Sequence, residues 1–498
     1  MDLLSNLALG LAESITLTNL FFCLVGCILG TLVGVLPGLG PSATIAMLLP
    51  ITYGMDPTAS LIMLSGIYYG AQYGGSTTAI LVNLPGEASS VVTAIDGYEM
   101  ARKGQAGQAL AIAAIGSFVA GTIATLLIAM FAPLLTTVAL RFSAVEYFSL
   151  MILGLVMSVV LAHGSLLKAL AMIALGLLVG VVGTDINSGA NRFTFGFIEL
   201  SDGVDIVAAA MGIFGLAEII DNLVSPEGRT RSASVKNLMP SREQFRASVG
   251  PILRGTGLGS ILGILPGGGA LLSSFASYAL EKRISRSPER FGHGAIEGVA
   301  GPESANNAGS QTSFIPMLTL GIPSNVVMAL MIGAMIIHGI QPGPAVIRDQ
   351  PNLFWGLIVS MWIGNFMLVV LNLPLVGIWV RLLSIPYKVL FPAVMVFTAI
   401  GVFSLNNSSF DIYVMVAFGV LGYFLRRMDC EPAPFFLALV LSPMIEQYFS
   451  RALMQSRGDL SVFVTRPISA VLLTATALAI VAATLPFLRK TREEALKE

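Results

Sequence analysis

Long apolar runs dominate the chain and are separated by short polar connections. Examples are Thr18–Leu36, Ala109–Met130, Tyr147–Ala162, Leu166–Val182, Leu353–Val376 and Ile468–Phe487. A helix needs about 20 apolar residues to cross the hydrocarbon core of a bilayer, and the chain has room for roughly 10–14 such segments. The pattern therefore predicts an all-α polytopic membrane protein.

Composition strengthens this prediction. The chain is 55% hydrophobic and 11% charged, against about 25% charged in soluble domains. The N-terminus has no basic region before its first apolar run, so we expect no cleavable signal peptide. The net charge of −1 points to no partner, and we expect no nucleic acid. Cys23, Cys27 and Cys430 match no metal or disulfide spacing and are interpreted as small core residues.

One short pattern occurs twice. Residues 30–40 read GTLVGVLPGLG, and residues 259–269 read GSILGILPGGG, 229 positions later. Glycines at four-residue spacing line one helix face and let another helix approach closely in lipid. Pro-Gly ends the helix, and at membrane depth such a break is tolerated only inside protein or beside a water-filled cavity. For one copy, helix packing alone would be a sufficient explanation. We interpret the following residues as structural: Gly34, Pro37, Gly38, Gly40, Gly263, Pro266, Gly267 and Gly269.

A second pair of similar stretches follows these. GGSTTAILVNLPGEASS (74–90) resembles AGSQTSFIPMLTLGIPSN (308–325), with four extra residues in the later copy. Each is a hydroxyl-rich helical piece followed by a proline and a second polar-headed helix start. Broken helices at matching places in two halves are typical of the binding site of a transporter.

The basic residues differ between corresponding loops. The turn at residues 54–57 has none, whereas its counterpart EKRISRSPER (281–290) has four; conversely, residues 96–104 carry Arg102 and Lys103, and residues 341–350 only Arg348. By the positive-inside rule, equivalent loops then lie on opposite sides of the membrane. We predict two inverted transmembrane repeats, residues 1–224 and 249–498, joined by a cytoplasmic linker at 225–248. The Pro-Gly regions could be full breaks or re-entrant hairpins.

Four segments are polar within apolar surroundings: residues 70–78, 83–90, 298–312 and 321–325. Their hydroxyl and amide groups are neutral donors and acceptors, and none of the segments contains Lys or Arg. Half-helix N-termini suit a carboxylate, and exposed carbonyls suit Na⁺. The alternative is that these groups only cap broken helices. The predicted substrate-binding residues are Ser76, Thr77, Thr78, Asn83, Gly86, Ser89, Asn306, Asn307, Ser310, Gln311, Thr312, Ser324 and Asn325.

Acidic residues inside a membrane are costly and are functional candidates by default. Glu303 follows Pro302 at an expected helix start, where a capping role is as good an interpretation as cation coupling. We assign ion coupling to Glu303, Asn306 and Pro323. Glu87 and Asp96 are weaker candidates, expected in loops. The histidines at positions 163, 293 and 338 are interpreted as incidental.

Several enzyme motifs are absent from the sequence. It contains no HExxH, no GxSxG nucleophile elbow and no Walker A motif. We therefore predict a protein that is not an enzyme and has no cofactor. Without a site for ATP, transport must be driven by an ion gradient (Na⁺ or H⁺) or by the substrate gradient.

The motifs resemble those of the large membrane subunit of the tripartite tricarboxylate transporters. The stretches that carry the resemblance are GTLVGVLPGLGPSATIAMLLPITYGMDP, GIYYGAQYGGSTTAILVNLPGEASS, TAIDGYEMARKGQAG and GVAGPESANNAGSQTSFIPMLTLGIPSN. They cover both halves of the chain. GPESANN followed by LTLGIPSN is hard to obtain by chance.

The resemblance implies a permease of the bacterial inner membrane that imports organic carboxylates along a cation gradient. It further implies a small membrane subunit and a periplasmic solute-binding protein that delivers the substrate. By analogy with inverted-repeat carriers, the two polar break regions would form a mobile transport domain. The alternative is a stand-alone cation-coupled carboxylate carrier that needs no binding protein. The substrate, the coupling ion and a homodimeric state stay open.

Overall fold

The computed structural model is almost entirely helical. It describes residues 3–36, 40–161, 165–185, 188–224, 235, 238–265, 269–382, 395–396, 398–400, 402–403 and 406–484. Pro37, Gly38, Pro266, Gly267 and His163 lie outside these ranges, as do most of the predicted linker and the C-terminal tail. Within them the sheet is one short antiparallel ladder of β1 (Gly183–Thr184) and β2 (Asn191–Arg192). The predicted all-α class agrees with this fold.

The elements of the first half, in chain order, are α1 (Leu3–Ser14), α2 (Leu17–Val35), α3 (Pro41–Thr52), α4 (Pro57–Val82), η1 (Ala88–Ser90), α5 (Val91–Arg102), α6 (Ala106–Ala139), α7 (Ala144–Leu161), α8 (Leu166–Gly180), η2 (Ile198–Leu200), α9 (Ile206–Ala210), the π-helical η3 (Met211–Leu216) and α10 (Ala217–Val224).

The elements of the second half are α11 (Arg242–Leu262), α12 (Gly269–Ile284), η4 (Pro288–Arg290), α13 (Glu297–Thr312), α14 (Phe314–Leu320), α15 (Val326–Ile337), α16 (Val346–Asp349), α17 (Pro351–Asn372), α18 (Val376–Leu382), α20 (Ser409–Arg427), α21 (Pro432–Gln455), α22 (Val462–Thr465) and α23 (Pro467–Thr484).

Two helix pairs are packed through their glycines in the same way. A Cβ atom on Gly26, Gly30 or Gly34 of α2 would lie 2.2–2.4 Å from a backbone oxygen of α4. The same holds on α11, where a Cβ on Gly255, Gly259 or Gly263 would lie 2.3–2.4 Å from a backbone oxygen of α13. Such distances exclude any side chain at these positions. The glycine spacing thus brings α2 against α4 and α11 against α13, as small residues do between membrane helices.

The contacted oxygens define how the two copies correspond. They belong to Met63, Ile67 and Ala71 in α4 and to Gly301, Ala305 and Gly309 in α13, each 238 positions later. Later in the chain, Pro85 and Pro323 have the same separation. The sequence comparison placed Gly75 opposite Gly309, and the contacts correct this by one helical turn. The additional residues of the second copy therefore precede α13 and are not part of its hydroxyl-rich stretch.

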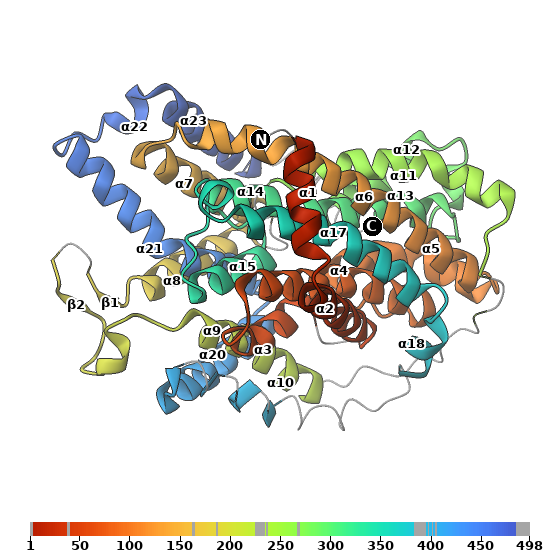
Figure 1. The fold of residues 1–498 in the computed structure, drawn as a ribbon, viewed down its shortest axis with the longest axis horizontal. Helices are drawn as coiled ribbons and strands as arrows, with labels where there is room; N and C mark the ends of the chain where they lie inside the picture. The colour runs from red at the N-terminus through yellow and green to blue at the C-terminus, as the bar shows by residue number, and fades with distance from the viewer. Residues whose placement is uncertain are drawn as a thin grey trace.

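The two central helices, α4 and α13, are enclosed by other helices. Every residue from Thr58 to Val82 is buried, and so is every residue from Gly298 to Thr312. In Figure 1, α5, α6, α11, α12 and α13 lie together, and α7, α8, α21 and α23 form another group. The polar residues of α13 therefore lie inside the protein, where they find hydrogen-bond partners that lipid could not supply.

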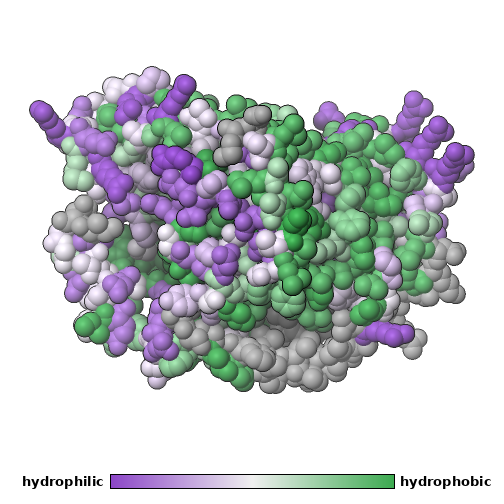
Figure 2. Space-filling model, in the orientation of Figure 1, coloured by the Kyte–Doolittle hydropathy of each residue, from purple (hydrophilic) through white to green (hydrophobic). Residues whose placement is uncertain are grey.

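The outer helices match a membrane environment. Among the described residues, α2, α6, α17 and α20 are long and apolar enough to cross a membrane, and five shorter apolar helices accompany them. Leu17, Phe21, Leu134 and Phe366 expose more than half of their side chains. Figure 2 shows apolar residues gathered over the centre and right of the visible face, with hydrophilic residues over its left part and at the far upper right. The number of crossings stays a prediction.

Three expectations about local structure are wrong. Glu303 does not stand at a helix start, because α13 begins at Glu297, and Pro302 lies inside the helix. Asp96 lies within α5 and not in a loop. Residues 281–290 include the last turn of α12, so Lys282 and Arg283 are helical. In each case the helix extends through residues that looked like a boundary.

Candidate functional site

Glu303 is buried where α13 meets α4 and α5. Its side chain is fully buried, and both carboxylate oxygens have hydroxyl partners. Ser76 Oγ of α4 donates to Oε2 over 2.7 Å, and the Thr93 hydroxyl of α5 bonds to Oε1. No ion pair with Glu303 is formed by the residues that the structure describes. The carboxyl group, which belongs to the second half of the chain, is therefore held by two neutral hydroxyl groups of the first half.

A second acid, Glu87, lies close by and partly buried, at the break after α4. Glu87 Oε1 accepts a hydrogen bond from Asn306 Nδ2 of α13 over 3.1 Å. The Ser89 hydroxyl lies within bonding distance of Glu87, of Asn306 Oδ1 at 2.9 Å and of Gln72 Oε1 at 3.0 Å. One hydroxyl has one hydrogen and can donate to one of these oxygens at a time. Acceptors thus outnumber donors around Ser89.

The break after α14 carries a different polar group. Asn325 caps α15: its Oδ1 accepts from the Met328 N–H over 3.0 Å. Its Nδ2 donates to Ser313 Oγ over 3.1 Å and to Tyr68 OH of α4 over 3.3 Å. Ser324 Oγ donates to the Ser313 carbonyl over 3.1 Å. The start of α15 is therefore tied to both α13 and α4.

The family model described as "Tripartite tricarboxylate transporter TctA family" matches residues 20–437, which include most of α2 and all of α4, α5, α13, α15 and α17. The chain belongs to this family. The family is one of tripartite transporters, so this protein is a subunit of a membrane transporter.

Two relatives come from Agrobacterium vitis. This TctA-family chain is 62% identical over 499 residues to an uncharacterized 52.8 kDa protein in the TAR-I ttuC' 3' region, covering all of this chain and 99% of the relative. It is 58% identical over 240 residues to an uncharacterized protein in the TAR-II ttuC' 3' region, covering 48% of this chain and 99% of that protein. No solved structure matches the chain.

The TctA-family fold brings some predicted site residues together and gives others local roles. Ser76, Ser89 and Asn306 meet around Glu303 and Glu87, and Ser324 and Asn325 meet at the second break. Asn307 Nδ2 donates to Ser117 Oγ over 2.7 Å, and Gln311 Oε1 accepts from Thr125 Oγ1 over 3.2 Å, which ties α13 to α6. The remaining hydroxyls, Thr77, Thr78, Ser310 and Thr312, bond to backbone carbonyls of their own helices.

Three further predicted residues have backbone roles. Asn83 is exposed and ends α4 in the left-handed conformation, with φ of 57°. A Cβ on Gly86 would lie 1.9 Å from the Gly34 carbonyl oxygen, so Gly86 packs the break against α2. Gly269 starts α12 with φ of 42°, whereas a Cβ on Gly40 would have its nearest neighbour, Ser42 Oγ, at an ordinary 3.9 Å. These positions shape the site without lining it.

Sequence reasoning missed several polar residues that take part. Thr93, Gln72 and Ser117 contact the two acids or their partners. On α17, Asn365 Oδ1 accepts from Tyr73 OH of α4 over 2.7 Å. Gln72 lies within the polar segment 70–78 but was not chosen as a site residue, whereas Thr93, Ser117 and Asn365 are single polar residues between apolar ones, without a local cluster to indicate them. A single Asn in a membrane helix was the available signal, since such a group needs a partner in lipid.

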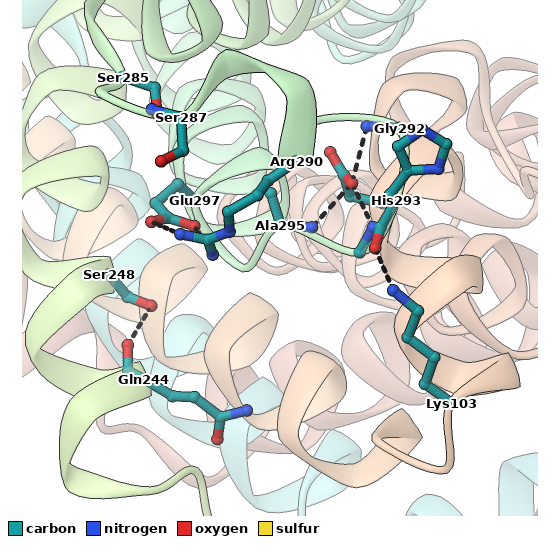
Figure 3. A network of polar contacts seen from close by, with 12 residues as sticks. Lys103, Gln244, Ser248, Ser285, Ser287, Arg290, Gly292, His293, Ala295 and Glu297 are labelled. Atoms are coloured by element: carbon teal, nitrogen blue, oxygen red, sulfur yellow. Dashed lines mark hydrogen bonds and ion pairs between the residues drawn. The ribbon is translucent and has the colours of Figure 1, made fainter.

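Asp96 has a structural role beside the site. It is fully buried, and Oδ1 accepts from the backbone N–H groups of Gly292, Gly294 and Ala295 over 2.7–2.9 Å. Figure 3 shows this loop, with Lys103 Nζ donating to the His293 carbonyl nearby. Together these contacts fix α5 to the segment before α13. They hold Thr93 opposite Glu303.

The three cysteines are buried and carry free thiols. Cys23 and Cys27 lie one turn apart on α2, and their Sγ atoms point to the Ser360 and Gly364 carbonyls of α17, at 3.9 and 3.6 Å. The described residues hold no group of three His, Cys, Asp or Glu side chains that could bind a metal ion. The interpretation of the cysteines as core residues agrees with this packing.

Proposed function

We propose that this TctA-family protein is the permease that imports organic carboxylates, of tricarboxylate or dicarboxylate type, along a cation gradient. The observation that supports this best is the meeting of α4 and α13 at two helix breaks. There, hydroxyl and amide groups from both halves are buried together, and no basic side chain forms an ion pair with Glu303 or Glu87 in the described part of the chain. Matched breaks of this kind form the substrate sites of inverted-repeat transporters.

The substrate site is expected at the two breaks. The N-terminus of α15, capped by Asn325, and that of α5, preceded by η1, present backbone N–H groups with partial positive charge. These groups, with the Ser89 hydroxyl and the Asn306 amide, would hold a carboxylate without a full counter-charge. Weak holding suits a carrier, because a carrier must release its substrate.

The architecture we propose is an inverted repeat. Residues 1–224 and 249–498 form the two halves, and residues 225–248 form the cytoplasmic linker. The equal separations between the glycine contacts and between the prolines support a repeat, and the loop charges support inversion. The elements around α4 and α13 would move together against the outer helices.

The tripartite system implies partners for this protein. We propose that it lies in the bacterial inner membrane with a small membrane subunit and receives its substrate from a periplasmic solute-binding protein. The second candidate is a stand-alone carrier of the same architecture. This second candidate is supported by the polar site described above, because all of its residues belong to one chain.

Reconstitution distinguishes the two candidates. The chain would be placed in liposomes with and without its small subunit and binding protein, and uptake of labelled carboxylates would be measured under Na⁺ and H⁺ gradients. We expect uptake only with the complete system and only with a gradient. Full-rate uptake by the chain alone would overturn the need for a binding protein. Absence of uptake with the complete system, for a broad panel of carboxylates, would overturn the proposed function.

A further inference from the structure

A small cavity borders Glu303 between α4, α6, α13 and α17. It leaves about 10 Å³ for the centre of a water-sized sphere, which is room for about one water or one small ion. Six of its lining residues carry side-chain oxygen atoms: Tyr73, Ser76, Thr77, Ser117, Glu303 and Asn372. The others are Leu110, Ala113 and Ala114, and no lining residue is Lys, Arg or His.

Two hydroxyl groups of this lining, those of Tyr73 and Thr77, donate their hydrogens to acceptors that are not side chains of the cavity lining. Thr77 Oγ1 donates to the Tyr73 carbonyl over 3.1 Å, and Tyr73 OH donates to Asn365 Oδ1 over 2.7 Å. A hydroxyl has one hydrogen and two lone pairs, so these two hydroxyls can offer only lone pairs, as acceptors or ligands, to a species in the cavity. Ser76 Oγ has two acceptors within reach, Glu303 Oε2 and the Gln72 carbonyl at 3.0 Å. The lining is therefore rich in acceptors and poor in donors.

Asn372, at the end of α17, independently indicates that the cavity holds a bound species. It is 4% exposed, and its Nδ2 donates to the Leu368 carbonyl over 3.0 Å and to Thr31 Oγ1 over 3.4 Å. Its Oδ1 is buried and has no hydrogen-bond partner among the residues that the structure describes. A buried carbonyl oxygen without a partner costs free energy. A species that satisfies both this oxygen and the Glu303 carboxylate must be positively charged or donate hydrogens.

We propose that this cavity binds the coupling cation as Na⁺, with Glu303 as the charged ligand and Asn372 Oδ1, Tyr73 and Thr77 as neutral oxygen ligands. The proposal rests on the proposed function as a cation-driven transporter. One carboxylate balances one positive charge, whereas a divalent ion would leave a charge uncompensated in a buried site. Glu87, Ser89 and Asn325 do not line the cavity, so cation and carboxylate would occupy separate places.

Cation binding can be measured without any substrate. The purified full-length chain in lipid nanodiscs would be heated in increasing NaCl, with choline chloride keeping the ionic strength constant and KCl in parallel. A ligand that binds only the folded state raises the unfolding midpoint in a saturable way. We expect this rise with Na⁺ and not with choline. We expect Glu303→Gln to abolish it and Asn372→Ala to weaken the apparent Na⁺ affinity about tenfold or more.

A matched control separates this site from a general loss of packing. Gln108 on α6 also has a buried side-chain oxygen without a partner in the described structure, but it does not line the cavity. Gln108→Ala should keep the wild-type response to Na⁺. If Glu303→Gln gives no folded protein, the comparison of Asn372→Ala with Gln108→Ala decides the matter.

Two results would overturn the proposal. One is a wild-type midpoint that Na⁺ moves no more than choline does, which would leave water or a proton as the occupant. The other is an Asn372→Ala variant with the wild-type response to Na⁺. Neither result would contradict the proposed function, because carboxylate uptake could then be driven by a proton gradient. Conversely, if carboxylate uptake failed, Na⁺ binding could still be measured, because that experiment uses no substrate.

Discussion

At Asn83 and at Gly321 the chain makes the same left-handed turn, with φ of 57° and 71°, two residues before a proline. Two residues after each proline the backbone is again alike: Glu87 has φ of −150° and Asn325 has φ of −155°. The side chains at these last positions behave differently. Asn325 caps α15, whereas Glu87 makes no capping bond to η1 and accepts from Asn306 instead.

The central helices α4 and α13 also share a similar backbone arrangement but carry different side chains at corresponding positions. Glu303 of α13 corresponds to Ser65 of α4, 238 positions earlier, in the register of the glycine contacts. Ser65 Oγ is buried and has no partner within the described structure, whereas Glu303 is bonded by two hydroxyls from the first half. The two similar stretches therefore share their backbone turns and glycine contacts, and they differ in where the acid lies. The first copy carries its acid at the break and the second carries it within the helix.

The largest expected effect tests the shared part of the two copies. Gly34→Leu and Gly263→Leu should each abolish folded protein, because the new Cβ would lie 2.4 Å from the Ala71 or Gly309 carbonyl oxygen. Gly257→Leu is the matched control, since a Cβ there meets nothing within 4 Å. Size-exclusion chromatography of the detergent-solubilised variants would measure the folded yield. Wild-type yield for both variants would contradict the glycine packing.

The second test concerns the unequal acids. Glu303→Gln should lower carboxylate uptake roughly 10- to 100-fold, the range seen when a metal ligand loses a supporting group. Ser65→Ala, at the corresponding position of α4, should leave uptake close to that of the wild type, because Ser65 Oγ bonds to no described residue. Initial uptake rates at equal amounts of reconstituted protein would measure both. Equal losses in the two variants would show that the copies contribute alike.

A third test exchanges the two turn residues. Gly321→Asn should destabilise the protein by about 1–3 kcal/mol, because a Cβ at Gly321 would lie 2.7 Å from the Pro342 carbonyl oxygen. Asn83→Gly should cost only a few tenths of a kcal/mol, since glycine adopts the left-handed conformation readily. Thermal unfolding in detergent would compare the two variants with the wild type. Equal shifts would mean that the two turns have the same surroundings.

The test with the smallest expected effect distinguishes a residue that caps a helix, Asn325, from a residue proposed to act in the substrate site, Glu87. Asn325→Ala should cost about 1 kcal/mol of stability through loss of the α15 cap. Glu87→Gln should leave stability nearly unchanged, because Glu87 caps no helix, but it should lower uptake. Unfolding midpoints and uptake rates measured on the same preparations would test this. A stable, fully active Glu87→Gln variant would remove Glu87 from the proposed site.

The sequence by itself determined the helical class and the family of this protein, and it led to the prediction of a repeat. Apolar run length fixes membrane helices, because lipid leaves backbone groups no partner outside a helix. Glycines at four-residue spacing identified α2 and α11 as close-packed helices, since only glycine permits backbone contact at such distances. The breaks at Asn83–Pro85 and Gly321–Pro323 were visible because proline and glycine interrupt helices wherever they cluster.

Tertiary structure alone decided which polar residues meet. Glu303 lies in the second turn of α13 because the helix begins at Glu297, and its partners Ser76 and Thr93 come from elements more than 200 residues away. Asn372 is a single amide near the end of an apolar helix, and only the packing of α17 brings it to the cavity that Glu303 borders. Local propensity carries no information about such distant pairs. Their positions depend on helix packing, which the glycine contacts set.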